Sequence, residues 1–487
     1  MDTTLPPPNQ AATALAARIR QAVIWRSGSQ IVAQLVQWAA TFAVIRILQP
    51  ADYGLYAMTG VVLAFLNLLN GYSLASGLVR APAITPAQVR QVFGLLLLLN
   101  ATLAAVQFAA APLVADYYRQ DAVAAMLRVQ CLLYLATPFI TLPGALLARE
   151  MDFARQARVN ILASIAGAAT ALGGALAGWG VWTLVWAPIA LFGVRALGMT
   201  IAARSLVAPS FRFAGAGALI RYGGIATAAQ FFWFVQVQAD VVIAGRQVDA
   251  HAVGLYTTAL FLTQIFQNKV VPPLNEVAFS AYARLEPAAV GQAWLRSATA
   301  ILAAALPLYL GIAATADPLV RVALGEHWAD AAPLVRALGG AMPFMTLYVL
   351  IPPATDALGR PGIGVRAAAI GAVVLPLAYL VAVRGGPETL ALVWLVTQPA
   401  MLWVLCRRAL PVLGLSAQSV AAAIAPSVRA GLAMALAVVL LDRVVGGLPV
   451  TPRLALLVAT GAIVYLGWLL TFSRGTVDAL IDLVRRR

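Results

Sequence analysis

The chain has 487 residues, of which 62% are hydrophobic and only 10% are charged. Ordinary soluble domains are about 45 to 50% apolar and about 25% charged, so this composition excludes a water-soluble fold of this size. Apolar runs of about 20 residues, the length that crosses a bilayer, recur from Ile31 to Phe472. We therefore expect an all-α polytopic membrane protein.

The formal net charge of +15 comes from 33 Lys and Arg residues against 18 Asp and Glu residues. In a membrane protein such an excess follows from the positive-inside rule and from attraction to anionic lipid headgroups. No basic cluster alternates with aromatic residues, as nucleic-acid binding would require. The expected partners therefore include membrane lipids and no nucleic acid.

Several familiar kinds of chemical site are missing from the sequence. Cys131 and Cys406 lie inside apolar runs and His251 and His327 stand far apart, so neither a disulfide nor a metal site is indicated. A phosphate-binding G-x-x-x-x-G-K-[ST] loop is also absent. We expect no cofactor, no catalytic residues and no enzymatic activity.

Continuous apolar runs predict membrane-spanning helices, whereas the strands of an outer-membrane barrel would alternate. Fourteen runs bounded by charged residues, Pro or Gly cover residues 28–48, 55–79, 92–114, 124–147, 159–178, 182–203, 222–246, 254–275, 294–315, 332–351, 363–383, 389–408, 426–445 and 453–472. None of the connections between them is long enough for a folded extramembrane domain.

This segmentation also predicts the domain organisation. The expected parts are a cytoplasmic N-terminal segment 1–27, a first six-helix bundle 28–204, a cytoplasmic linker 205–221, a second six-helix bundle 222–408, a cytoplasmic linker 409–425, two extra transmembrane helices 426–473 and a basic cytoplasmic tail 474–487. With both termini in the cytoplasm, 22 basic residues fall on the cytoplasmic side and nine on the other. Arg195 and Lys269 remain inside spans, and the asymmetry favours this orientation.

An internal repeat relates the two predicted bundles. Residues 52–56 (DYGLY) open the second span, and residues 252–256 (AVGLY) open the eighth. Residues 143–149 (PGALLAR) and 353–360 (PATDALGR) likewise end the fourth and tenth spans. Because six is an even number, the halves should be parallel, with a substrate path between them.

Four motifs occur in order along nearly the whole chain. They are residues 43–56 (AVIRILQPADYGLY), residues 146–153 (LLAREMDF), residues 240–245 with 253–256 (DVVIAG and VGLY), and residues 325–328 with 331–334 (GEHW and AAPL). As a set, they resemble those of the polysaccharide transporter family, which comprises the O-antigen and lipid-linked oligosaccharide flippases of the multidrug/oligosaccharidyl-lipid/polysaccharide exporter superfamily.

The resemblance implies about fourteen helices in two pseudo-symmetric six-helix bundles plus two C-terminal helices. It further implies a flippase of the bacterial inner membrane that works by alternating access. Such a protein translocates undecaprenyl-pyrophosphate-linked oligosaccharide from the cytoplasmic to the periplasmic leaflet, for lipopolysaccharide, capsule or exopolysaccharide synthesis. A glycan polymerase or other export machinery would be a further partner.

A lipid-linked oligosaccharide carries an anionic pyrophosphate, for which the planar guanidinium fork is well suited. The candidate substrate-binding residues are cations inside spans or at their ends, namely Arg46, Arg80, Arg195 and Lys269, with Arg26 at the cytoplasmic mouth. Snorkelling to the headgroups is the alternative role for Arg46 and Arg80. Lys269 precedes Pro272 and Pro273, which interrupt a helix and free backbone carbonyls.

Two carboxylates are candidates for ion coupling. Asp240 lies inside span seven and Glu276 closes span eight. An isolated carboxylate in hydrocarbon is costly, so Asp240 must have a partner, a cavity or a proton. A structural pair with a neighbouring Arg is the alternative for Asp240, and a solvated interfacial position is the alternative for Glu276.

Two other functions remain open. A small-molecule or multidrug antiporter of the same superfamily would favour an acidic, aromatic cavity over an Arg-rich one. A membrane glycan polymerase or glycosyltransferase of the same pathway is disfavoured because no large periplasmic loop is present.

The predicted orientation can be tested with a reporter that is active only in the cytoplasm. Fusions near Arg90, Arg155 and Arg487 should give signal, and fusions near Gln120 and Gly386 should be silent. Signal from both sets, or the reverse pattern, would contradict the fourteen-span topology.

Overall fold

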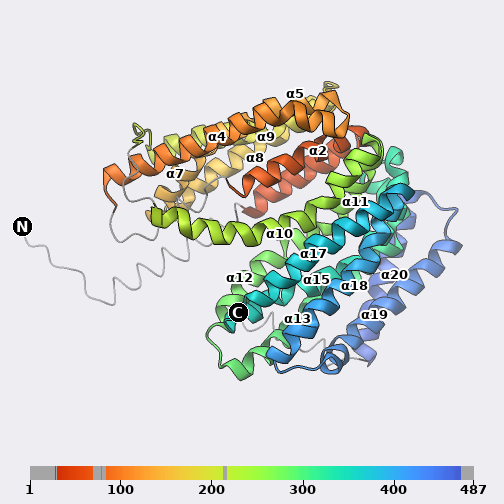
Figure 1. Cartoon of the computed structure of the whole chain (residues 1–487). Helices are drawn as coiled ribbons and strands as arrows, with labels where there is room; N and C mark the ends of the chain where they lie inside the picture. Colours follow the sequence, from red (N-terminus) through yellow and green to blue (C-terminus); the bar gives the residue numbers. More distant parts are fainter. Residues whose placement is uncertain (1–27, 29, 70–77, 79–83, 212–216, 473–487) are drawn as a thin grey trace, which may run out of the picture. The chain divides into compact units, whose positions relative to one another are not determined.

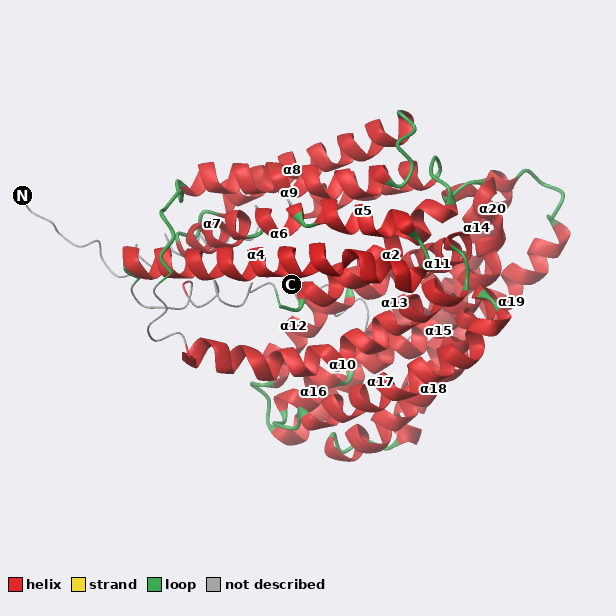
Figure 2. Ribbon diagram, turned by 45° about the horizontal axis from the view of Figure 1, so that its top comes forward, coloured by secondary structure: helices red, strands yellow, loops and turns green. Residues whose placement is uncertain are grey.

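Residues 28, 30–69, 78, 84–211 and 217–472 are described in the computed structural model, over residues 217–230 by the backbone alone. The described residues form helices joined by loops and turns (Figure 2). The chain divides into two compact units, Met1–Gln230 and Phe231–Arg487. Each unit has its own core, so each is described by itself.

The first unit contains a helix over Gln30–Ile45, followed by α2 (Pro50–Asn67), α4 (Pro86–Tyr118), α5 (Asp121–Gln130), α6 (Leu132–Ala136), α7 (Pro138–Arg149), α8 (Phe153–Leu176) and α9 (Trp182–Ala203) (Figure 1). Its helices begin at recognisable caps. At the start of α4, the Thr85 hydroxyl accepts a hydrogen bond from the Gln88 amide, and the Gln88 side chain accepts one from the Thr85 amide.

Close helix packing in the first unit depends on small residues. On α8, a Cβ atom added at Gly167 would come within 2.9 Å of the Leu191 Cβ atom on α9. Backbones approach this closely only where a side chain is absent, as is common in membrane helices. Beyond α9, the Ser210 amide donates to the Arg90 carbonyl at 2.9 Å, which holds the described part of the predicted linker 205–221 on α4.

The second unit contains α10 (Gly217–Gln247) from Phe231 onward, then α11 (Ala250–Lys269), α12 (Val271–Tyr282), α13 (Pro287–Ala314), α14 (Ala316–Ala323), η1 (Glu326–Ala331), α15 (Ala332–Leu350), α16 (Pro352–Ala357), α17 (Gly362–Ala382), η2 (Val383–Gly385), α18 (Pro387–Val412), α19 (Ala417–Val444) and α20 (Val450–Phe472). The last two helices pack on each other, and α19 also packs on α13.

The helix boundaries extend the repeat seen in the sequence. Helix α2 begins at Pro50 after Gln49, and α11 begins at Ala250 after Asp249, again 200 residues later. The Asp249 carboxylate accepts a hydrogen bond from the Ala252 amide at 2.7 Å. This cap fixes the first turn of α11 and thereby the position of residues farther along the helix.

Each predicted run overlaps a described helix, and ten helices are long and apolar enough to cross a membrane. The chain is therefore a multi-pass membrane protein of the all-α class, while the count of fourteen spans stays a prediction. Two runs differ from the expectation of continuous helices. Residues 124–147 lie in three consecutive pieces, α5 to α7, and the run 254–275 is divided between α11 and α12.

Two helix breaks in the second unit have the same chemical cause. Pro272 and Pro273 follow the end of α11, and Pro352 and Pro353 follow the end of α15. Proline lacks the N–H group that would bond the carbonyl four residues earlier, so each pair frees carbonyls at the end of the preceding helix. The short helices beyond the breaks, α12 and α16, pack against each other.

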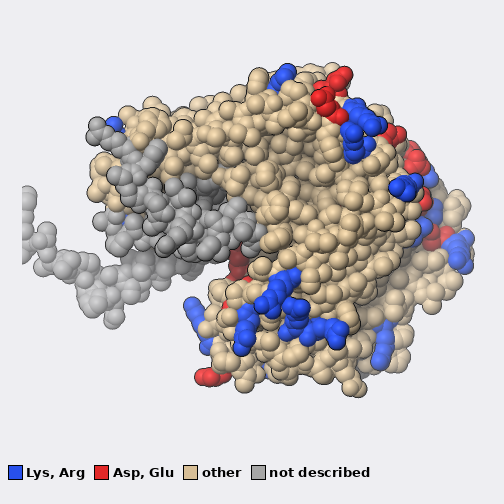
Figure 3. Space-filling model, viewed as in Figure 1, with Lys and Arg blue, Asp and Glu red and all other residues tan. Residues whose placement is uncertain are grey.

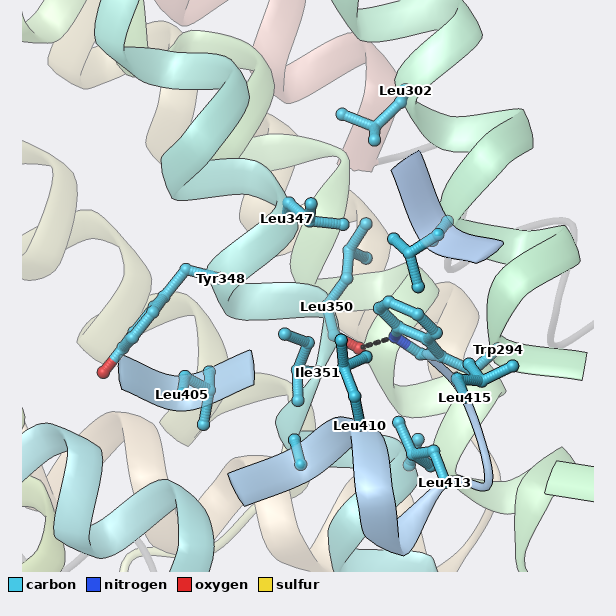
Figure 4. Close-up of a cluster of buried hydrophobic side chains, with 14 of the residues drawn as sticks. Trp294, Leu302, Leu347, Tyr348, Leu350, Ile351, Leu405, Leu410, Leu413 and Leu415 are labelled. Carbon is cyan, nitrogen blue, oxygen red and sulfur yellow. Dashed lines mark hydrogen bonds between the residues drawn. The ribbon is translucent and has the colours of Figure 1, made fainter. Parts of the chain in front are cut away.

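Side chains from neighbouring helices satisfy the carbonyls freed at the end of α15. The Asn275 amide of α12 donates to the Val349 carbonyl at 3.1 Å. The Trp294 indole of α13 donates to the Leu350 carbonyl at 2.9 Å, inside the apolar cluster drawn in Figure 4. The breaks are thus built into the packing of the second unit and are not local defects.

Trp294→Phe should lower the thermal unfolding midpoint of the purified protein, because it removes the indole donor and leaves the Leu350 carbonyl buried without it. The expected loss is about 1 to 3 kcal/mol. Trp186→Phe is the matched control, since Trp186 is 40% exposed. Equal midpoints for the two variants would contradict this role for Trp294.

Candidate functional site

Asp240 on α10 is the only charged residue with a buried side chain in the described part of the chain, and its exposed fraction is 0%. The Tyr256 hydroxyl of α11 donates to its Oδ2 atom at 2.7 Å, and the Val241 amide donates to its Oδ1 atom at 2.7 Å. Both carboxylate oxygens are therefore hydrogen-bonded. Among the described residues, none of the ion pairs involves Asp240.

The hydrogen bonds continue from Asp240 into a third helix. The Trp394 indole of α18 donates to the Tyr256 hydroxyl oxygen at 2.9 Å, which leaves that hydroxyl free to donate its own proton to the carboxylate. Tyr256 is 0% exposed and Trp394 is 2% exposed. The result is a chain, Trp394 to Tyr256 to Asp240, that joins three helices inside the apolar interior.

A fourth helix contributes a second phenol. Tyr379 on α17 is fully buried and interacts electrostatically with both Asp240 and Tyr256. Its hydroxyl has no hydrogen-bond partner among the described residues. We call Asp240, Tyr256, Tyr379 and Trp394 the buried acidic cluster.

The helices of this cluster are fixed by neighbouring contacts. One turn before Asp240, the Gln236 amide donates to the Ala368 carbonyl of α17 at 2.7 Å. A Cβ atom added at Gly371 would lie only 2.5 Å from the Gln236 Nε2 atom, so glycine makes room for this contact. Tyr256 lies two turns beyond the Asp249 cap of α11. The contact of Gln236 with α17 and the cap of α11 therefore fix the helices on either side of Asp240.

The corresponding place in the first unit is neutral. At the 200-residue offset, Ala40 corresponds to Asp240 and Tyr56 to Tyr256. The first unit instead buries amides and hydroxyls, among them Gln130, whose amide donates to the Thr59 hydroxyl at 3.1 Å. The two units therefore share a repeat but differ in where they hold a buried charge.

The predicted substrate-binding cations occupy different surroundings. Arg46 is exposed in the turn that follows the helix ending at Ile45. Arg195 is half-buried on α9, eight residues before its last residue, Ala203, as the sequence predicts. Arg26 and Arg80 lie outside the described residues.

Lys269 and Glu276 lie on either side of the break after α11. Lys269 is the last residue of α11, not an interior residue of a continuous span, because the helix ends before Pro272. Its side chain is exposed, as is that of Glu276 on α12. Lys269 is about 20 Å along α11 from Tyr256 at the helical rise per residue, so the structure does not bring it into the buried acidic cluster.

Buried polar side chains lie next to Lys269 at the end of α11. Gln267 is buried, and its side-chain oxygen accepts a hydrogen bond from the Thr346 hydroxyl at 2.9 Å. The Thr346 hydroxyl in turn lies 3.0 Å from the Tyr309 hydroxyl. The last turns of α11 thus carry a buried amide beside an exposed cation.

A separate set of charges lies where α14 and η1 meet the α19–α20 connection. Arg321 bonds Asp317 at 3.0 Å and also pairs with Glu326, while Arg453 bonds Asp442 at 2.7 Å and Asp317 at 3.4 Å. The hydrogen bond and charge of Asp317 raise the pKa of Arg321 above its ordinary value. These ion pairs join α14 to the two C-terminal helices. Each arginine in them is neutralised by neighbouring carboxylates.

The polar partners of Asp240 are the part of this site that sequence reasoning missed. Tyr256 is in the repeated motif, but Tyr379 and Trp394 lie more than 120 residues farther along the chain. An aromatic residue inside an apolar run usually indicates packing. The only available signal was the need of Asp240 for a hydrogen-bond donor.

Comparison with known proteins points to one kind of process. The sequence profile of a family described as "Polysaccharide biosynthesis protein" matches residues 43–333. The chain is 27% identical over 455 residues to the succinoglycan biosynthesis transport protein ExoT of Rhizobium meliloti (strain 1021), covering 91% of this chain and 90% of the relative. It is 21% identical over 303 residues to the lipopolysaccharide biosynthesis protein WzxC of Escherichia coli (strain K12), covering 60% of each.

The fold has a solved counterpart. A structure of the lipid II flippase MurJ in an inward closed conformation superposes with a TM-score of 0.75 at 11% sequence identity, covering 93% of this chain and 100% of that one. At this identity the likeness establishes the fold alone.

A double-mutant cycle tests the bond between Tyr256 and Asp240. Tyr256→Phe should destabilise the protein, because the carboxylate loses its side-chain donor, and the loss should shrink when Asp240 is also changed to Asn. We expect a coupling of about 1.5 to 3 kcal/mol, the range for hydrogen bonds to charged groups.

Tyr379→Phe is the matched control for this cycle, since it removes a buried hydroxyl that has no described hydrogen bond. Its thermal unfolding midpoint should stay near that of the unmodified protein. If Tyr256→Phe and Tyr379→Phe behave alike, the carboxylate does not depend on Tyr256.

Proposed function

Because the chain belongs to the family of polysaccharide biosynthesis proteins, we propose that it is a flippase for undecaprenyl-pyrophosphate-linked oligosaccharide units. It would move them from the cytoplasmic to the periplasmic leaflet of a bacterial inner membrane by alternating access, with both termini in the cytoplasm. The observation that carries this proposal is the similarity to a transport protein of polysaccharide biosynthesis over 91% of the chain. A glycan polymerase or other export machinery would act beside it.

The proposed substrate contacts are the predicted cations. Arg46, Arg80, Arg195 and Lys269, with Arg26 at the cytoplasmic mouth, would bind the pyrophosphate. Guanidinium groups suit this role because they remain charged when half-buried and donate two parallel hydrogen bonds. The exposed side chain of Lys269 and the half-buried side chain of Arg195 are compatible with contact to a polar headgroup.

Asp240 is the proposed ion-coupling residue, with Glu276 as a second candidate. A carboxylate that is 0% exposed and bonded only to a tyrosine and a backbone amide among the described residues has no fixed cation to neutralise it. Uptake of a proton or another cation would neutralise it, and release would restore the charge. Such a group can link an ion gradient to a change in helix packing.

An antiporter of small molecules is the second candidate function. It is favoured by the buried acidic cluster, which combines a carboxylate with three aromatic side chains. All four side chains are buried, however, so they leave no surface for a drug-sized cation to contact. The cluster therefore fits the binding of a small ion better than the binding of a drug.

Purified protein in vesicles tests the proposal. Radiolabelled lipid-linked oligosaccharide placed in one leaflet should become accessible from the other to an impermeant glycosidase, faster than in empty vesicles. Extrusion of a cationic dye without movement of the oligosaccharide would instead establish the antiporter.

Arg46→Ala and Arg46→Lys distinguish pyrophosphate binding from snorkelling. If Arg46 holds pyrophosphate, both variants should slow translocation at normal protein levels, because Lys keeps the charge but loses the planar fork. The control is Arg158→Ala, an exposed arginine on α8 of the same unit. Full activity of both Arg46 variants would remove this residue from the site.

Asp240→Asn tests ion coupling. The variant should bind substrate and fold, but lose the dependence of transport on an imposed ion gradient, since the amide cannot gain and lose charge. Asp249→Asn is the matched control, because Asn also caps a helix and transport should persist. Gradient-dependent transport by Asp240→Asn would contradict the coupling role.

A further inference from the structure

The two ends of the second unit differ in how their charges are balanced. The end formed by α14, η1 and the α17–α18 and α19–α20 connections has as many acidic as basic residues, which are Asp249, Asp317, Glu326, Asp330, Glu388 and Asp442 against Arg246, Arg321, Arg336, Arg384, Arg443 and Arg453. Every described ion pair of this unit is found there. This end therefore supplies much of its own counter-charge.

The opposite end is strongly basic. We name its six exposed arginines the arginine rim: Arg284, Arg296, Arg360, Arg366, Arg407 and Arg408. The acidic residues of this end are Glu276, Glu286 and Asp356, and none of them forms an ion pair with a rim arginine among the described residues. Figure 3 shows basic side chains gathered over α13 and α17. Within the described residues, the rim therefore has a large excess of positive charge.

Part of the rim is organised on the α17–α18 hairpin. The Arg407 guanidinium lies 4.7 Å from the ring centroid of Trp403, one turn earlier on α18, and Trp403 is 60% exposed. Helices α17 and α18 pack against each other as an antiparallel pair, so Arg366, near the start of α17, and Arg407, near the end of α18, lie at the same end of the hairpin. One end of this hairpin thus carries two exposed guanidinium groups and an exposed indole.

This combination matches the interface between a bilayer and water. An exposed tryptophan favours the headgroup level, and its contact with Arg407 keeps the guanidinium at the same depth. Arginine binds phosphate through paired hydrogen bonds, and each basic residue near an anionic surface contributes about 1 kcal/mol to lipid binding. A phosphate group is therefore the expected counter-charge.

The phosphate could belong to bulk phospholipid or to the pyrophosphate of a transported lipid, and the distribution of the rim separates these sources. Its arginines come from the α12–α13 and α16–α17 connections and from α13, α17 and α18. A single pyrophosphate can contact only a few guanidinium groups, whereas many separate headgroups can contact arginines spread over the end of a unit. We propose that the arginine rim binds the phosphate headgroups of anionic bulk phospholipids, with Arg366, Arg407 and Trp403 forming its principal site.

Native mass spectrometry of the full-length protein in detergent tests this proposal, with phosphatidylglycerol and phosphatidylcholine as the added lipids. The test variant changes Arg366, Arg407 and Arg408 to Gln. The control variant changes Arg336, Arg384 and Arg443 to Gln, which removes the same charge from exposed positions at the opposite end. Thermal unfolding in lipid-free detergent verifies that both variants fold.

The rim variant should bind phosphatidylglycerol about a hundredfold more weakly than the unmodified protein, because each of the three lost arginines contributes about 1 kcal/mol, and the control variant should bind it normally. Phosphatidylcholine should bind weakly and equally to all three proteins. Equal losses in the two variants, or no preference for phosphatidylglycerol, would overturn the proposal. Displacement of phosphatidylglycerol by equimolar inorganic pyrophosphate would assign the rim to a diphosphate ligand instead. A failure of oligosaccharide translocation would leave these binding results unaffected, because the rim is independent of the proposed transport function.

Discussion

In the hydrocarbon core of a membrane no water is available to bond a carbonyl or to solvate a carboxylate, so a carbonyl freed by a helix break and a buried carboxylate each need a donor within the protein. The described residues of the second unit follow this constraint in two ways. Where Pro352 and Pro353 interrupt a helix, Asn275 and Trp294 donate to the carbonyls at its end. Where Asp240 is buried, Tyr256 and a backbone amide donate to its oxygens. The helix breaks and the buried charge are both stabilised by contacts between helices, so a shift of one helix must alter the bonds of another.

Because contacts between helices stabilise Asp240, the charge of Asp240 and the packing of these helices depend on each other. Tyr256 can donate only one proton, and Trp394 already donates to its oxygen. If Asp240 gains a proton, it no longer needs that donor and can itself donate to a second oxygen. The Tyr379 hydroxyl, which has no described hydrogen bond, is a buried group with this capacity on a different helix. In the proposed ion coupling, a change of charge at Asp240 would alter its hydrogen bond to Tyr256 and so the contact between α10 and α11. The first unit has Ala40 at the corresponding position, so only one of the two repeats carries this carboxylate.

The positions of the helices could be predicted from the sequence, because they depend on the local pattern of apolar residues. Continuous apolar runs gave the helices, and the bounds of α9 agree with the predicted run 182–203 because Gly180 precedes it and Arg204 follows it. The burial of Asp240 followed from its distance to the end of its run. Its partners could not be predicted, because they depend on how α11, α17 and α18 pack around α10, and hydropathy is the same for a tyrosine that donates to a carboxylate and one that only fills space. The sequence predicted the break at Pro272 and Pro273, but not that α11 ends ahead of them. Pro272 and Pro273 affect the carbonyls four residues before them, so the helix ends at Lys269, ahead of the prolines themselves.

The absence of water in the hydrocarbon core also explains why the charged residues of the second unit lie at its two ends. A charge in the apolar interior is stable only with a specific partner, and Asp240 is the single described example. All other described charges of this unit must extend to a surface where water or headgroups solvate them. At the end that contains α14 they meet acids and form ion pairs, which reduces their need for lipid. At the arginine rim the acids are too few, and Arg407 contacts an exposed indole in place of a carboxylate. An excess of arginine at one end both orients the chain by the positive-inside rule and holds that end at the headgroups.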